Sequence, residues 1–162
     1  MVGYVIIGSA LSRLIDYDLS KAMEKAKEYI IKSDVWYATD IIGERVPGNA
    51  LVNHFDETFS IVETFFTESN PWVKRNMGVA VHFFAKRIRG DREKAKKLLE
   101  LLAPYYEEKD TRIVKGIGWG LKTLGRYYPD LVVEFLKSQK GRNPSPLLIR
   151  KATTYLPAQK EN

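Results

Sequence analysis

The chain has 162 residues, which is enough for one domain with a sizeable buried core. It carries 26 Lys and Arg against 20 Asp and Glu, and the resulting net charge of +6 favours a polyanionic partner. The sequence has no cysteine and only two histidines, which excludes disulfides and thiolate metal sites and argues against a histidine-bound metal; we expect no metal and no cofactor.

The start of the chain is apolar. Residues 1–10 lack the basic segment of a signal peptide and are followed by a charged helix, so we interpret them as part of a packed first helix. No stretch of the sequence reaches the roughly 18 apolar residues that a membrane helix needs. We therefore expect a cytoplasmic protein without a membrane partner.

Helical periodicity runs through most of the chain. Apolar residues recur at three and four positions, whereas the strict alternation of a strand is nearly absent. This pattern predicts an all-α protein of about nine helices, roughly at residues 3–15, 20–32, 34–46, 56–68, 71–89, 91–106, 111–127, 129–139 and 145–156. We expect one domain over residues 1–162, in which residues 1–17 cap the stack and residues 157–162 form a polar tail.

Helix-capping residues mark several of these boundaries. The candidate caps are Asp18 and Ser20, Asn70 followed by Pro71, and Asp110 or Thr111. The segment Pro47-Gly48-Asn49 is predicted to end the third helix and to begin the longest break, at residues 47–55. We see no second domain beyond that break.

Three helices open with similar segments. These lie at residues 33–36, 69–72 and 109–112, so Ser33 and Ser69 are 36 positions apart and Ser69 and Lys109 are 40 apart. A period near 40 residues is typical of HEAT-like helix pairs, which stack into a solenoid. The predicted fold is a right-handed α-α superhelix of HEAT-like repeats whose inner helices line a concave surface. An ordinary helical bundle with chance similarity between its caps is the alternative.

Two of the predicted inner helices display parallel basic stripes. In residues 71–89 the stripe contains Arg75, His82, Lys86 and Arg89, with Gly78 among them. In residues 111–127 it contains Lys115, Trp119, Lys122 and Arg126, with Gly118 among them. Basic groups can neutralise phosphates, and an aromatic ring can pack on a sugar or a base. The alternative is that these residues form ordinary solvated charged faces. That explanation is adequate for a single helix but less so for two helices whose basic stripes recur at the repeat period.

Apolar residues occupy the other face of the same two helices and predict their core contacts. They are Val73, Met77, Ala80, Phe84 and Ile88 in the first helix, and Ile113, Ile117, Leu121 and Leu124 in the second. Gly116, Gly118 and Gly120 lie inside the second helix and indicate close approach by a neighbouring helix or by a ligand backbone. We favour tight helix packing for at least one of them.

A carboxylate lies on the third predicted helix. Trp36 and Asp40 are four residues apart and so share a helix face. DNA phosphates repel a carboxylate, so a carboxylate on a DNA-binding face is unfavourable unless it has a function. One such function is to stabilise the cationic sugar that forms when an N-glycosidic bond breaks. The alternative is that Asp40 caps a helix or forms a salt bridge within the fold, for instance with Arg45.

Four segments resemble the DNA alkylation repair glycosylases of the AlkD-like family. Residues 36–40 resemble its W-x-x-x-D element, residues 72–75 its W-x-x-R element, residues 115–122 its K-A-I-G-W-x-L-R element, and residues 149–152 its closing R-x-A helix. The resemblance extends from about residue 18 to residue 156. Each motif alone is weak, but their order and spacing together are fairly specific.

The resemblance implies a site and an activity. Asp40 matches the catalytic carboxylate, Trp36 and Trp119 match the tryptophans that flank the lesion, and Arg75 matches an arginine on the DNA backbone. The family excises N3- and N7-alkylated purines from duplex DNA without pulling the base into a pocket. We therefore predict a DNA glycosylase whose double-stranded DNA ligand also contacts the basic residues of both stripes, namely Lys115, Lys122, His82, Lys86 and Arg126.

The chain departs from the family pattern at two points. Lys122 replaces an arginine, which keeps the charge but loses the bidentate fork. Only one predicted helix precedes the repeat that carries Trp36, where members of the family carry several more helices that clamp the duplex. The alternatives are therefore a non-catalytic HEAT-like module that recognises nucleic acid by shape and charge, a protein–protein adaptor, and a homodimer that completes the groove through residues such as Val5, Ile6 and Ile7.

Overall fold

Helices account for most of residues 2–157, the part of the chain that the computed structural model describes. In chain order they are α1 (Val2–Leu14), α2 (Leu19–Ser33), α3 (Trp36–Gly43), α4 (Asn49–Asn53), α5 (Phe55–Glu63), α6 (Pro71–Arg87), α7 (Arg92–Leu102), α8 (Thr111–Tyr127), α9 (Pro129–Ser138) and α10 (Pro146–Ala152). Within these residues there is no strand, which confirms the all-α prediction. Apart from Pro157, the polar tail expected at residues 157–162 lies outside the described residues.

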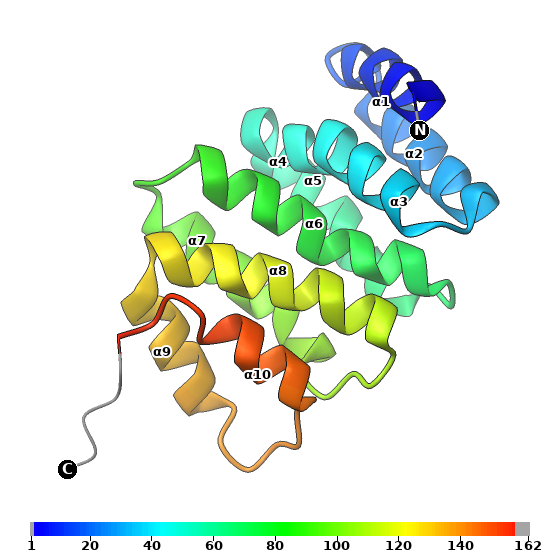
Figure 1. Cartoon of the computed structure of the whole chain (residues 1–162). Coiled ribbons are helices and arrows are strands. Elements are labelled where there is room, and N and C mark those ends of the chain that lie inside the picture. Colours follow the sequence, from blue (N-terminus) through cyan, green and yellow to red (C-terminus); the bar gives the residue numbers. More distant parts are fainter. Residues whose placement is uncertain (1, 158–162) are drawn as a thin grey trace.

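The helices form two layers (Figure 1). The front layer consists of α1, α3, α6, α8 and α10, and each of these helices packs against the next. Helices α2, α5, α7 and α9 lie behind it. This arrangement is the predicted helical-repeat superhelix, with front-layer helices stacked side by side. None of the helices in residues 2–157 is long and apolar enough to span a bilayer.

The third helix does not end where the sequence predicted. Helix α3 continues through a π-helical turn, η1 (Glu44–Gly48), directly into α4, so the expected break at residues 47–55 is wrong. A π turn shifts the backbone hydrogen bonds to wider spacing, and this accommodates Pro47, which has no N–H to donate. Pro47 and Gly48 are buried, and a Cβ on Gly48 would lie 2.7 Å from the Cβ of Phe83 in α6. The chain turns only at His54, between α4 and α5.

Helices α6 and α8 pack backbone to backbone at the centre of the front layer. A Cβ on Gly78 would overlap the main chain of Gly116, and a Cβ on Gly116 would overlap the carbonyl of Arg75. A Cβ on Gly120 would likewise lie only 2.9 Å from the carbonyl oxygen of Gly78. Tight helix packing is therefore confirmed for Gly116 and Gly120. Gly78 lies in this contact and not on an open face among the basic residues.

The capping residues predicted for α2, α6 and α8 form the expected hydrogen bonds. The carboxylate of Asp18 accepts from the Lys21 amide at 2.9 Å, and that of Asp110 accepts from the Arg112 amide at 2.8 Å. Asn70 accepts from the Trp72 amide at 2.9 Å, with Pro71 at the first helical position. These caps fix where α2, α6 and α8 begin, and so fix which side chains reach the front of the molecule.

The predicted core faces of α6 and α8 are confirmed, since all of their apolar residues are buried except the half-buried Ile88. Two helix ends differ from the prediction. Helix α6 ends at Arg87, so Arg89 follows the helix and does not extend its basic stripe. Helix α10 ends at Ala152 instead of residue 156, and the chain beyond it forms turns.

Candidate nucleic-acid interface

Three adjacent cavities follow α8 along the front layer. The first, of about 370 Å³, is lined by Trp36, Trp72, Arg75, Thr111, Arg112 and Lys115. The second, of about 470 Å³, is lined by Arg75, Lys115, Trp119, Lys122, Leu147, Arg150 and Lys151. The third, of about 230 Å³, is lined by His82, Lys86, Trp119, Lys122, Thr123, Arg126, Tyr127 and Tyr155. Because neighbouring cavities share lining residues, they form one continuous surface, which we call the basic groove.

Cations dominate this groove. Within residues 2–157, six of its lining residues form no ion pair with an acidic side chain: Lys86, Lys115, Lys122, Arg126, Arg150 and Lys151. Burial lowers the pKa of Lys151, and the nearby charges of Lys122 and Arg75 lower it further. Positive charge is thus concentrated in the groove without neutralisation, which is the electrostatic condition for binding an anion.

Two of these six cations were not among the predicted site residues. Arg150 and Lys151 belong to the R-x-A segment of α10, and the fold brings them beside α8. The Lys151 side chain lies against Gly118, where a Cβ would come within 2.6 Å of the Lys151 Cδ. The absence of a side chain at Gly118 therefore makes room for a neighbouring cationic side chain, that of Lys151.

Trp119 rests on a buried histidine. The His82 ring stacks under the Trp119 indole with centroids 3.9 Å apart and planes at 24°. The Thr123 hydroxyl donates to the Trp119 carbonyl at 3.0 Å, so it accepts from His82 Nδ1 at 2.7 Å. Burial, together with the charges of Lys86 and Arg87, lowers the pKa of His82 to about 4. His82 is therefore neutral at pH 7 and, at 8% exposure, it supports the indole from below.

Asp40 and Arg75 form a bidentate ion pair between α3 and α6. Arg75 Nε lies 2.8 Å from Asp40 Oδ1, and Arg75 Nη2 lies 2.8 Å from Asp40 Oδ2. The third nitrogen, Nη1, donates to the main-chain oxygen of Arg112 at 3.1 Å. The Asp40 and Arg75 side chains are 15% and 9% exposed, respectively. The salt bridge considered for Asp40 thus exists, but its partner is Arg75 and not Arg45.

This ion pair does not use all the hydrogen-bonding sites of Asp40 and Arg75. A carboxylate has about four lone-pair sites, and Arg75 occupies two of those on Asp40, so the remaining sites can accept from a water molecule. Arg75 has five N–H groups, of which three are engaged inside the protein. The predicted contact of Arg75 with a DNA backbone is thus restricted to its two remaining N–H groups.

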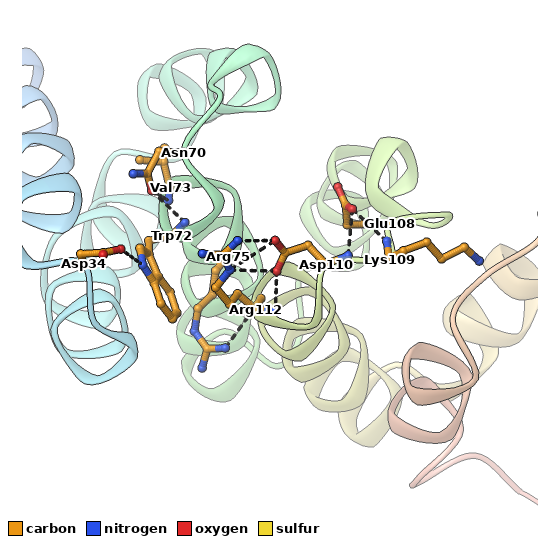
Figure 2. A network of polar contacts seen from close by, with 9 residues as sticks. All are labelled: Asp34, Asn70, Trp72, Val73, Arg75, Glu108, Lys109, Asp110 and Arg112. Atoms are coloured by element: carbon orange, nitrogen blue, oxygen red, sulfur yellow. Dashed lines mark hydrogen bonds and ion pairs between the residues drawn. The ribbon is translucent and has the colours of Figure 1, made fainter.

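Two tryptophans line the first cavity. Trp36, the first residue of α3, is 56% exposed and meets Tyr37 edge to face. Trp72 is held in place, since its Nε1 donates to Asp34 Oδ1 at 2.7 Å, and Figure 2 shows this contact beside the Arg112 guanidinium on Asp110. Trp72 and Arg112 were not predicted as site residues. The sequence feature that could have identified them is the similarity of the two helix starts at residues 69–72 and 109–112, to which they belong.

The predicted site residues come together only in part. Arg75, Lys115, Trp119 and Lys122 line the second cavity, and Lys86 and Arg126 line the third. Trp36 lies at the far end of the groove from Arg126, and Asp40 connects to the groove through Arg75. No group of three His, Asp or Glu side chains in residues 2–157 could hold a metal ion.

A family model described as DNA alkylation repair enzyme matches residues 6–156. The chain belongs to this DNA alkylation repair enzyme family. The matched residues of this family member include Asp40, Arg75 and the whole of the basic groove, so family membership and the groove concern the same part of the chain. No curated protein and no solved structure shows significant similarity to it.

Proposed function

We propose that this family member is a DNA glycosylase that removes N3- and N7-alkylated purines from duplex DNA, with Asp40 as its catalytic residue. The observation that supports it most directly is a fixed carboxylate, Asp40, joined through Arg75 to a groove of unpaired cations. The cations suit phosphates, whereas a carboxylate in the same region suits a developing positive charge.

The proposed reaction is hydrolysis of the N-glycosidic bond. Alkylation at a ring nitrogen makes the purine cationic, so it leaves readily with the electron pair of the breaking bond. The sugar becomes cationic at C1′ and is stabilised by the Asp40 carboxylate. A water molecule that donates to a free lone pair of Asp40 adds its oxygen to C1′ and releases its proton to solvent through that carboxylate.

Arg75 is proposed as a positioning residue for Asp40. Its two bonds of 2.8 Å fix both the position and the rotation of the carboxylate, and the bond from Nη1 to the Arg112 carbonyl fixes the guanidinium in turn. A carboxylate that is held in advance does not need to reorganise when charge develops in the transition state.

The groove is long enough for several nucleotides. From Arg112 to Arg126 helix α8 covers roughly 21 Å at about 1.5 Å per residue. One strand of duplex DNA carries a phosphate about every 3.4 Å along its axis, so this length corresponds to about six phosphates. Trp119, held by His82, lies midway along the groove and would pack on a sugar or a base.

Base release tests this proposal. Wild-type protein should release 7-methylguanine and 3-methyladenine from methylated duplex DNA, and Asp40→Asn should release them roughly a hundredfold more slowly or worse. The matched control is Asp130→Asn, because Asp130 pairs with Arg92 between α7 and α9, behind the front layer. Asp130→Asn should keep the wild-type rate. Equal rates for wild type and Asp40→Asn would refute the role of Asp40.

A second candidate function is a DNA-binding module without catalysis. The largely buried Asp40–Arg75 pair favours it, since such a pair can serve the fold alone. In that case wild-type protein would bind duplex DNA and release no base, and Asp40→Asn would change only the free energy of unfolding.

A further inference from the structure

A larger cavity lies away from the basic groove, between α5 and α7 behind the front layer. Its volume of about 590 Å³ is within the range of small-ligand pockets. It extends to the 3₁₀ turns that follow these helices, η2 (Thr64–Thr67) and η3 (Ala103–Tyr105), and the buried Met77 lines it from α6. None of its lining residues in the described chain also lines the basic groove. We call it the rear cavity.

Two carboxylates line the rear cavity from different helices. Glu63 is the last residue of α5, Glu100 belongs to α7, and both side chains are exposed. Neither forms an ion pair with another residue in 2–157. The cation that accompanies them in the lining is Lys97, and its Nζ lies 3.4 Å from Asp56 Oδ1. The rear cavity is therefore acidic, although the whole chain carries a net charge of +6.

The main chain adds to this negative potential. Helix α5 ends at Glu63 and α7 ends at Leu102, so the last turn of each helix borders the rear cavity. The C-terminal end of an α-helix carries a partial negative charge that stabilises a nearby cation. Two helix ends and two free carboxylates thus favour the same kind of ligand.

Aromatic rings supply the apolar part of the lining. They belong to Phe59, Phe66 and Tyr105, and Phe66 is 47% exposed. The rings of Phe66 and Tyr105 meet edge to face with their centroids 5.5 Å apart. Ring faces attract cations and also pack on apolar groups. This lining suits a molecule that combines a positive charge with an apolar body.

The hydroxyl of Tyr105 is a further polar group at this position. Tyr105 is only 2% exposed, and its hydroxyl has no hydrogen-bond partner within residues 2–157. A buried hydroxyl in a folded protein normally has a partner. An acceptor atom on a bound molecule would supply one.

We infer that the rear cavity binds a small organic cation, in which an ammonium or guanidinium group is joined to an apolar body. Glu63 and Glu100 would pair with the charged group, while Phe59 and Phe66 would pack on the apolar part. An anion would be repelled by the two carboxylates, and a neutral molecule would gain nothing from them. This site is independent of the proposed action on DNA, because its charge repels phosphates.

Three matched probes test the charge preference. They are 4-phenylbutylammonium, the neutral 4-phenylbutan-1-ol and the anion 4-phenylbutyrate. Binding is measured by NMR of methionine methyl groups labelled with carbon-13, because Met77 lines the rear cavity and Met23, on α2, does not. The ammonium should shift the Met77 resonance with a millimolar or lower dissociation constant, roughly tenfold tighter than the alcohol. The Met23 resonance should not move, and the anion should leave Met77 unshifted.

Variants of exposed side chains assign this preference to the rear cavity. Glu63→Gln and Glu100→Gln should each weaken ammonium binding about threefold, and the double variant should bind the ammonium and the alcohol equally. Phe66→Ala should weaken binding of both probes. Glu57→Gln is the matched control, since Glu57 is exposed on α5, forms no ion pair with a described residue and does not line the cavity. It should keep the wild-type affinity.

Equal affinity of the wild type for the ammonium and the alcohol would overturn the inference. So would a preference that survives in the double variant. A peptide, acetyl-Gly-Phe-Lys-Gly-amide, distinguishes a free cation from a basic segment of a partner protein. If the peptide bound at Met77 tenfold more tightly than the ammonium, the ligand would be a protein segment and the inference of a small cation would be wrong. Weaker or equal binding of the peptide supports the small cation.

Discussion

At the residue scale, the site depends on pairs of side chains from different repeats. Asp40 and Arg75 are 35 positions apart in the sequence, and His82 and Thr123 are 41 apart. Sequence spacing assigns a side chain to a face of its own helix, so it identified Asp40 and Arg75 as candidates. It could not predict that they bind each other, because the rotation of α3 against α6 depends on Gly43 and Asn76, which meet between these helices.

The buried His82 makes the free energy of unfolding depend on pH. Its pKa of about 4 in the folded protein lies below the ordinary value of 6.5, so the unfolded chain binds more protons between these values. The stability that the neutral ring provides is complete above about pH 6.5 and is lost as the pH falls towards 4. Because Glu44 Oε1 lies 3.7 Å from His82 Nε2 and would stabilise the protonated ring, we expect a loss of at most about 2–3 kcal/mol between pH 7 and pH 4.5.

Urea unfolding of wild type and His82→Gln at these two pH values measures this contribution. Glutamine can still bond to Thr123 but does not titrate, so the variant should lose less stability than the wild type on acidification. Equal losses in the two proteins would show that His82 does not titrate in this way.

At the element scale, glycines determine how closely the front-layer helices approach. The sequence indicated close approach within α8 but could not name the partner, which is α6 for Gly116 and Gly120 and Lys151 for Gly118. The π turn was not predicted because it too depends on packing against another helix. Pro-Gly-Asn normally ends a helix, and only the burial of Pro47 and Gly48 against α6 makes continuation favourable.

Substituting one of these glycines tests the packing of α6 against α8. Gly116→Ala should destabilise the protein by about 2–3 kcal/mol, because its methyl group would overlap the Arg75 carbonyl and force the helices apart. Gly3→Ala is the matched control, since nothing lies within 4 Å of that position in α1. It should be neutral or stabilise by less than about 1 kcal/mol. Thermal unfolding followed by circular dichroism distinguishes the two, and equal effects would contradict the packing.

At the scale of the whole molecule, one groove brings together six cations that have no acidic partner in residues 2–157. The net charge of +6 and the basic stripe on α8 were evident from the sequence. The contribution of Arg150 and Lys151 was not, because α9 and a loop separate α10 from α8 along the chain. Only the packing of α10 against α8 in the fold brings these cations to the stripe. Stacking of the repeats therefore creates the groove.

The six unpaired cations of the groove predict a steep dependence of DNA binding on salt. If each neutralises one phosphate, the logarithm of the association constant should fall with the logarithm of salt concentration with a slope of about −5. Lys122→Met should make that slope shallower by about 1. Lys21→Met, on α2 behind the front layer, should leave it unchanged. A slope near zero, or equal effects of the two variants, would contradict a phosphate-binding groove.

The most direct measurement of the central claim is the mass of the product strand. A duplex oligonucleotide with one 7-methylguanine is incubated with wild type or Asp40→Asn, and both strands are then analysed by mass spectrometry. Wild type should yield an intact strand in which a hydroxyl group replaces the methylated base, and Asp40→Asn should leave the strand unchanged over the same time. An unchanged strand with wild type, or the same abasic product with both proteins, would contradict hydrolysis at Asp40.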